Sequence, residues 1–272
     1  MIRVLVLLLV VYFLAMTAVF LGQRNLLYFP YRQTLEDSLV AGKRAGLEPW
    51  ENEGGKLIGW KKVLSSAAGA SHDRVLITHG NAGSAIDRID YAGAVNLTAP
   101  CDVYLLEYPG YGPLPGSPSE ESFFRAADEA MALLEKDGRG PIFIIGESLG
   151  TGVAAYMAGT HPQSVSGVLL IAPYHNLGDV AQSHMAIFPA RWMLRDKFPS
   201  ADYLRKYHGP LAVLLGGNDT TVPPRFGRKL FDAYAGPKKL WEMPTASHND
   251  LPNQSDSWWR ELFAFWKDHR AA

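Results

Sequence analysis

Apolar and polar positions divide this chain into two kinds of segment. Six short apolar runs lie next to glycine or proline, at residues 74–78, 102–107, 141–146, 166–172, 210–216 and 238–243. Their apolar character is nearly continuous, which predicts β-strands buried on both faces of a sheet. A looser alternation over residues 57–64 predicts an early edge strand.

Segments with helical spacing separate these runs. The clearest covers residues 117–136, where Ser117 and Glu120 fit a capping box with a proline between them, and Gly138 is expected to end the helix. A second helix is predicted over residues 255–270, with its tryptophans toward the core. Strands that alternate with helices predict the α/β class, with a mostly parallel central sheet flanked by helices.

One interval breaks this alternation. The stretch between Ala172 and Pro210 is about three times the dozen residues that a crossover needs, and it is rich in aromatic side chains. We interpret residues 173–209 as a small lid whose apolar face covers a pocket. The alternative is an ordinary helix with additional loop.

The amino-terminal segment is apolar on every side. Residues 4–21 contain no charged side chain and would form a helix about 27 Å long, close to the roughly 30 Å of a bilayer core. We therefore expect an N-terminal transmembrane helix in residues 1–24, a single-pass anchor, and one domain in residues 25–272. A cleaved signal peptide is the alternative, although Met16 fits its small-residue rule poorly. The basic residues after the run slightly favour a cytoplasmic domain but leave the side open.

Composition narrows the function classes. The chain has 26 Lys plus Arg and 27 Asp plus Glu, and this balance argues against nucleic-acid binding. With 47% hydrophobic residues it is expected to be globular. Its single cysteine, Cys101, excludes an internal disulfide framework and a zinc site built on several thiolates.

A G-x-S-x-G pattern stands where a strand meets a helix. Gly146, Ser148 and Gly150 follow the predicted strand 141–146 and open a helix-compatible segment. In such a sharp turn, the Ser148 hydroxyl projects from the strand end. The backbone N–H of Leu149 points to the same place, beside a helix terminus that favours negative charge. The pattern alone is a weak indication, and its context makes Ser148 the candidate nucleophile.

A serine nucleophile needs a base, and the base needs a group that orients it. Asp219 follows the predicted strand 210–216, and His248 follows the strand 238–243. Taken singly, Asp219 could be a turn residue and His248 a surface histidine. Their order along the chain, nucleophile then acid then histidine, favours a catalytic triad.

A second oxyanion donor is expected after the first apolar strand. His79 and Gly80 follow that strand, and we choose the backbone N–H of Asn81 as the donor. His79 precedes the nucleophile, so we expect a structural hydrogen-bonding role for it. His175 stays a secondary candidate because it lies near the predicted lid.

These residues resemble the α/β-hydrolase superfamily, and within it the single-pass membrane hydrolases similar to monoacylglycerol lipases and protein depalmitoylases. The matching segments are residues 27–30, 79–83, 107–112, 146–150, 217–219, 222–223 and 247–249. The resemblance implies the α/β-hydrolase fold with a lid in the same interval. It also assigns nucleophile, acid and base to Ser148, Asp219 and His248, and oxyanion donors to Asn81 and Leu149.

The expected reaction is two-step acyl transfer that cleaves a carboxylic ester or thioester. The anchor and the aromatic-rich lid favour a lipid-like acyl substrate, or a small-molecule one, at a membrane. No metal, organic cofactor or nucleic acid is expected, and the oligomeric state is left open. Two alternatives are a peptidase or amidase on the same fold and a catalytically silent, membrane-anchored binding protein.

Overall fold

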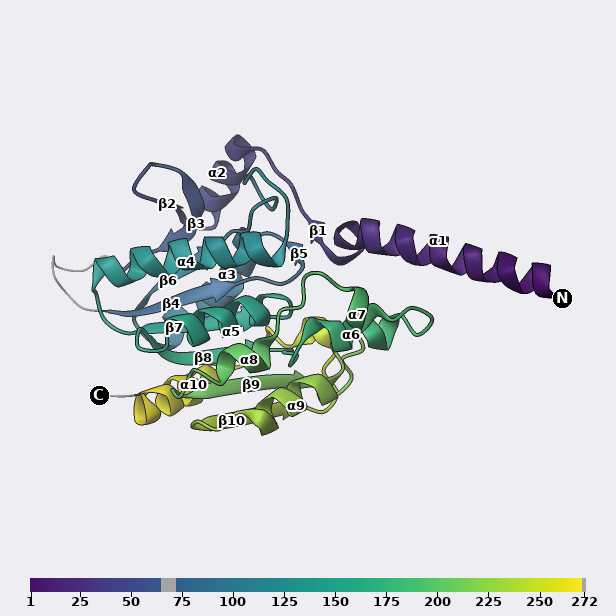
Figure 1. Cartoon of the computed structure of the whole chain (residues 1–272). Helices are drawn as coiled ribbons and strands as arrows, with labels where there is room; N and C mark the ends of the chain where they lie inside the picture. Colours follow the sequence, from purple (N-terminus) through teal and green to yellow (C-terminus); the bar gives the residue numbers. More distant parts are fainter. Residues whose placement is uncertain (65–71, 271–272) are drawn as a thin grey trace.

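A central eight-stranded sheet organises the protein. The computed structural model describes residues 1–64 and 72–270. The strands of this sheet are β2 (Glu48–Glu51), β3 (Leu57–Lys62), β4 (Asp73–Thr78), β6 (Cys101–Leu106), β7 (Ile142–Glu147), β8 (Val165–Ile171), β9 (Leu211–Gly216) and β10 (Lys238–Met243). Their order across the sheet is β10-β9-β8-β7-β4-β6-β3-β2 (Figure 1). The six strands from β10 to β6 are parallel to one another, whereas β3 and β2 join antiparallel.

Helices cover both faces of the sheet. In chain order, the helices of the described residues are α1 (Ile2–Leu27), which points away from the sheet (Figure 1), α2 (Leu35–Arg44), α3 (Ile89–Thr98), α4 (Glu120–Asp137), α5 (Gly150–Thr160), α6 (Leu177–His184), α7 (Ala190–Met193), α8 (Ser200–Leu204), α9 (Pro224–Ala233) and α10 (Asp256–His269), with 3-10 turns η1 (Ala85–Arg88) and η2 (His248–Asp250). One core cluster joins the sheet to α4, α5, α8 and α9, and the other joins it to α3 and α10. On β4, Leu76 belongs to the first cluster, and its neighbours Val75 and Ile77 belong to the second. Successive side chains of a strand point to opposite faces of the sheet, so each strand contributes to both clusters. This explains why the apolar runs are continuous.

The predicted α/β class with a mostly parallel sheet is confirmed. All six apolar runs form strands near their expected bounds. The prediction that residues 57–64 form an edge strand is wrong, because β3 lies between β6 and β2. The true edge, β2, contains Pro49, which lacks an N–H donor and suits an outer strand. The neighbouring Trp50 is buried against Tyr104, at 4.8 Å between ring centroids.

The start of α4 differs from the predicted one. The capping box does not use Ser117 and Glu120, because Ser119 is the N-cap and Ser122 is its partner. The Ser119 hydroxyl accepts the N–H of Ser122, and the Ser122 hydroxyl accepts the N–H of Ser119, each at 3.0 Å. This exchange satisfies two free donors at the helix start. Gly138 ends the helix in a left-handed conformation, as predicted.

The carboxyl-terminal helix α10 packs across the middle of the sheet. Trp266 is fully buried and stacks on Phe143 of β7 at 4.8 Å between ring centroids. Its indole N–H donates to the carbonyl of Val168 on β8 at 3.3 Å. The expected helix over residues 255–270 is confirmed, and α10 supports the two strands next to the candidate nucleophile.

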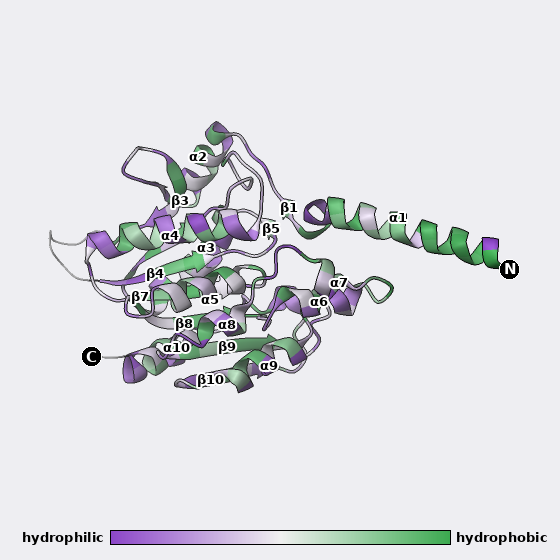
Figure 2. Ribbon diagram, viewed as in Figure 1, coloured by the Kyte–Doolittle hydropathy of each residue, from purple (hydrophilic) through white to green (hydrophobic). Residues whose placement is uncertain are grey.

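Helix α1 and, in the interval 173–209, the helices α6 and α7 extend from one side of the domain (Figure 1). The 26-residue α1 projects away from it (Figure 1) and is long and apolar enough to cross a membrane. The interval 173–209 holds the short helices α6, α7 and α8. Figure 2 shows hydrophobic residues along most of α1 and in the loop between α6 and α7. After α1, strand β1 (Phe29–Pro30) pairs in parallel with β5 (Ala82–Gly83) in a separate two-stranded sheet.

Candidate active site

Ser148 occupies a sharp turn between β7 and α5. Its φ of 50° lies in the left-handed region, which a residue with a side chain rarely adopts. Its N–H donates to the carbonyl of Ile171 on β8 at 2.8 Å. A Cβ at Gly150 would lie 2.3 Å from the carbonyl oxygen of Thr78, so α5 can approach β4 only at a glycine. Ser148 is thereby held in a strained conformation at the carboxyl end of the sheet.

Ser148, His248 and Asp219 meet at this end of the sheet. The Ser148 Oγ lies 3.0 Å from Nε2 of His248, and Nδ1 of the same ring lies 2.6 Å from Oδ2 of Asp219. An ionised carboxylate only accepts hydrogen bonds, so Nδ1 donates to Asp219. Nε2 is then free to accept the serine proton. This geometry allows proton transfer from hydroxyl to imidazole.

Hydrogen bonds to the second carboxylate oxygen of Asp219 hold this side chain in place. Asp219 is buried after β9, and its Oδ1 accepts the N–H groups of Thr221 and Val222 at 2.9 and 2.8 Å. The carboxylate therefore presents Oδ2 to His248 and cannot rotate without breaking both bonds. The turn that follows β9 thus places the Asp219 carboxylate against His248.

The loop that carries His248 is closed by a capping box that sequence analysis missed. Asp250 accepts the N–H and the hydroxyl of Ser247 at 2.8 and 2.7 Å. These hydrogen bonds hold the pKa of the Asp250 carboxyl below its ordinary value. The signal was present, because an aspartate three residues after a serine fits the capping pattern. Asp250 thus fixes the turn η2, in which His248 is the first residue.

The two expected oxyanion donors lie close to Ser148, because Leu149 follows it directly and a Cβ at Gly80, the residue before Asn81, would lie 3.5 Å from the Ser148 Cβ. The Asn81 carbonyl accepts the Tyr111 hydroxyl at 2.8 Å, and its Oδ1 accepts the N–H of Phe29 at 3.3 Å. Across residues 1–64 and 72–270, the backbone N–H groups of Asn81 and Leu149 donate to no protein acceptor. Both donors remain free for a ligand, while the loop that bears Asn81 is held by other atoms.

An ion pair beside the nucleophile escaped sequence analysis. Glu147, the residue before Ser148, accepts both the Nε and the Nη2 of Arg88 from η1, the latter at 3.3 Å. Burial opposes the charge on Arg88, but the Glu147 carboxylate outweighs it, and the pKa of the guanidinium is raised. This pair joins the nucleophile turn to the segment that follows the Asn81 loop. No spacing rule could have indicated it, because the two residues are distant in sequence.

His79 holds the same loop from within the protein. Its Nδ1 lies 2.8 Å from the Gly80 carbonyl, and its Nε2 lies 3.0 Å from Oε1 of Glu107. The other Glu107 oxygen accepts the N–H of Ala85 at 3.1 Å. Both side chains are buried. These contacts agree with the structural role expected for His79.

His175, the secondary candidate, lies in an ion cluster apart from Ser148. Its Nε2 contacts the Asp179 carboxylate and lies 3.0 Å from Nζ of Lys229. Burial lowers the pKa of this histidine, against the raising effect of Asp179. The cluster ties the beginning of α6 to α9, which indicates a structural role.

The interval 173–209 is bonded to the site at two points. The Tyr174 hydroxyl donates to the Leu149 carbonyl at 3.1 Å. At the far end of α6, the His184 Nε2 lies 2.9 Å from the carbonyl of Thr221, close to Asp219. The segment therefore borders both the nucleophile turn and the acid loop.

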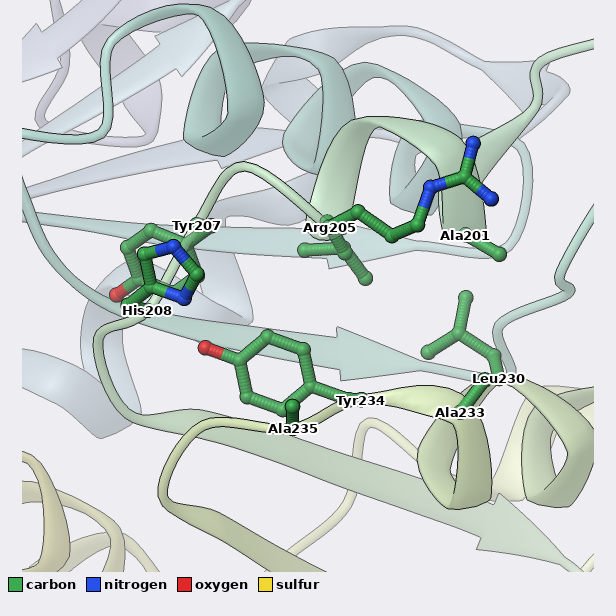
Figure 3. A pocket seen from close by; sticks show the side chains of 9 residues that line it. Ala201, Arg205, Tyr207, His208, Leu230, Ala233, Tyr234 and Ala235 are labelled. Atoms are coloured by element: carbon green, nitrogen blue, oxygen red, sulfur yellow. The ribbon is translucent and has the colours of Figure 1, made fainter.

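A surface pocket of about 350 Å³ lies elsewhere, between α8 and α9 (Figure 3). Tyr207 and His208 on one side and Tyr234 on the other line it just before β9 and β10 begin. Parallel strands start at the edge opposite their carboxyl ends, so this pocket is separate from Ser148. Among the described residues, no group of three or more His, Cys, Asp or Glu side chains is placed to hold a metal ion.

Comparisons with known proteins point to one family. A family model for the alpha/beta hydrolase fold matches residues 73–202. The uncharacterized protein Rv2307c of Mycobacterium tuberculosis is 33% identical over 234 residues, covering 84% of this chain and 81% of that protein. Lysophosphatidylserine lipase ABHD12 of Danio rerio is 30% identical over 195 residues, covering 63% of this chain and 50% of the lipase. The matched part is thus half of that lipase.

Solved structures share the architecture at low sequence identity. An esterase of Pyrococcus furiosus superposes with a TM-score of 0.65 at 14% identity and covers 90% of this chain and 99% of its own. A monoacylglycerol lipase of Paleococcus ferrophilus gives a TM-score of 0.56 at 19% identity, covering 71% and 94% of the two chains. These similarities confirm the fold. The family model and the sequence relatives show that the chain belongs to the α/β-hydrolase family.

Proposed function

We propose that this α/β hydrolase is a serine esterase or thioesterase. Ser148 is the nucleophile, His248 the general base and Asp219 the group that orients the imidazole. The observation that carries the proposal is the continuous hydrogen-bond chain from the Ser148 hydroxyl through both ring nitrogens of His248 to Asp219. Such a chain raises the nucleophilicity of a hydroxyl that is otherwise weak at neutral pH.

The reaction runs in two steps. The Ser148 Oγ attacks the acyl carbonyl while His248 Nε2 takes its proton, and Asp219 stabilises the resulting imidazolium. The N–H groups of Asn81 and Leu149 bind the negative oxygen, and loss of one such donor typically costs about 3–4 kcal/mol. His248 then protonates the leaving alcohol or thiol. Water, deprotonated by the same imidazole, cleaves the acyl-enzyme and regenerates the serine.

A lipid-like acyl chain is the proposed substrate class. Residues 1–24 serve as the membrane anchor in this proposal, and α1 supports it by its length and exposed apolar surface. The interval 173–209 serves as the lid. The names of two similar proteins, a lysophosphatidylserine lipase and a monoacylglycerol lipase, agree with a lipid acyl ester as substrate.

Activity-based labelling tests the nucleophile. The full chain in detergent micelles is treated with a fluorescent fluorophosphonate, and Ser148→Ala is expected to abolish labelling with an unchanged circular dichroism spectrum. Ser257→Ala, an exposed serine on α10, is the matched control and should label like the unaltered protein. Labelling that persists in Ser148→Ala contradicts the assignment.

A substrate panel then separates the reaction classes. Esters and thioesters of graded chain length are expected to be cleaved, and peptides and amides are not. Preferential cleavage of amides would identify a peptidase or amidase. A folded protein inert to both probe and panel across several detergents would identify a binding protein.

A further inference from the structure

Helix α1 contacts the interval 173–209 near the middle of the apolar run. The Tyr12 hydroxyl donates to the carbonyl of Ile187 at 2.9 Å, and the Tyr12 ring stacks on Phe188 at 5.9 Å between centroids. Ile187 and Phe188 belong to the loop between α6 and α7. The loop therefore reaches the middle of the apolar helix.

The position of Tyr12 sets the depth of this contact. At about 1.5 Å per residue, Tyr12 lies about 14 Å along the helix axis from Leu21, where the apolar run ends. Half of a bilayer core is about 15 Å thick. If α1 spans the core, the Ile187 contact lies near the centre of the bilayer.

The side chains at this end of the interval suit such a depth. Ile187 is 76% exposed and Trp192 is 81% exposed, although both are large and apolar. Single exposed apolar residues are common, but these two flank an apolar groove of about 40 Å³ between α1 and the interval. The lining of this groove includes Val19, Phe20, Met185, Phe188, Met193 and Leu194.

Apart from the Tyr12 hydrogen bond, the polar contacts described between these two elements lie where the apolar run ends. Gln23 accepts the N–H of Arg195 through Oε1 at 2.7 Å. Arg24 pairs with Asp196 at 2.9 Å, and Asp196 is only 3% exposed. The interface is thus apolar around Tyr12 and charged near Arg24, as the core and the headgroup layer of a membrane require.

We propose that the apolar side chains of residues 185–193, the lid tip, are embedded in the leaflet that holds the carboxyl-terminal half of α1, and that they contact the acyl chains of a phospholipid bilayer. The Gln23 and Arg24 contacts set the height and rotation of α1 against the lid tip. Because Tyr174 at the start of the interval is bonded to Leu149, the interval links the leaflet to the candidate nucleophile. This inference rests on the proposed anchoring by α1, but not on the proposed chemistry.

Depth-dependent quenching tests the proposal. The native Cys101 is buried, so an introduced surface cysteine is labelled selectively. Ile187→Cys carries a small environment-sensitive fluorophore in the full chain, reconstituted into phosphatidylcholine vesicles. Leu97→Cys on α3 is the matched control because Leu97 is also 76% exposed, and Leu9→Cys reports on α1 itself. Nitroxides on the lipid acyl chains and aqueous iodide are the two quenchers.

The label at Ile187 is expected to behave like the label at Leu9, with several-fold stronger quenching by acyl-chain nitroxides than at Leu97 and protection from iodide. Trp192→Cys repeats the measurement at a second site, and it replaces Ile187→Cys if that variant does not fold. If Leu9 is protected while Ile187 and Trp192 are as open to iodide as Leu97, the proposal is wrong and the anchor stands. If Leu9 is also open to iodide, the anchor itself is wrong.

Discussion

Asp219→Asn isolates the orienting role of the acid. In the folded protein, the asparagine Oδ1 can still accept the N–H groups of Thr221 and Val222, so the turn after β9 should keep its shape. The new amide group faces Nδ1 of His248, where only an acceptor satisfies it. The ring proton must then move to Nε2, which faces Ser148 and can no longer accept its proton.

The size of the effect follows from this change of tautomer. In Ser-His-Asp enzymes the same substitution lowers kcat about 10⁴-fold, which is about 5 kcal/mol of transition-state stabilisation. The stability cost should be far smaller. Two backbone hydrogen bonds remain and one charged bond becomes neutral, so the free energy of unfolding should fall by about 1 kcal/mol.

The assay compares hydrolysis of a soluble short-chain ester with thermal unfolding followed by circular dichroism. Asp268→Asn, an exposed carboxylate near the end of α10, is the control and should leave kcat/KM unchanged. A well-folded Asp219→Asn protein that keeps more than about a tenth of the original kcat/KM would refute the orienting role. An equal loss of kcat/KM in Asp268→Asn would indicate a general effect of removing a negative charge.

Three further changes test packing and pH dependence. Gly150→Ala forces its Cβ against the Thr78 carbonyl and should lower the free energy of unfolding by about 1–3 kcal/mol. Gly93→Ala, in open space on α3, is the control and should raise it by up to about 1 kcal/mol. Thermal unfolding distinguishes the two variants. Trp266→Ala should cost about 3–5 kcal/mol in urea unfolding, and a loss below about 1 kcal/mol would contradict its core role. Burial lowers the pKa of His175, so its stabilising contribution is complete above about pH 6.5 and is lost as pH falls through the folded-state value. His175→Gln should therefore flatten the decline of Tm between about pH 7 and 5, and an unchanged slope would exclude this source.

The parallel part of the fold could be predicted because its strands are buried on both faces. Such strands need continuous apolar runs, and these runs are visible without tertiary information. Edge strand β2 was missed because it has four residues, contains a proline and shows no alternation. The start of α4 was displaced because Ser117 and Ser119 both fit an N-cap, and only hydrogen bonds in the folded chain distinguish them.

The candidate site was predictable as far as it depends on strand ends. Ser148, Asp219 and His248 each follow a recognisable strand, and parallel strands bring those ends together. Apart from the Asp250 capping box, the side chains that fix the surrounding segments were not predictable from spacing. Arg88 meets Glu147 from 59 residues away, and Arg24 meets Asp196 from 172 residues away. Such ion pairs depend on the three-dimensional arrangement and leave no periodic trace.

The pairing of β1 with β5 limits how this protein can be shortened for crystallisation. The strand that leaves α1 lies directly against the Asn81 loop, and the N–H of Phe29 reaches the Asn81 side chain. A protein that starts at Asn25 lacks most of the hydrophobic helix α1 but keeps strand β1. A form that starts at Tyr31 removes it and leaves the loop unsupported on one side. Solubility screening should therefore vary the first residue only upstream of Phe29, so that β1 stays paired with the Asn81 loop.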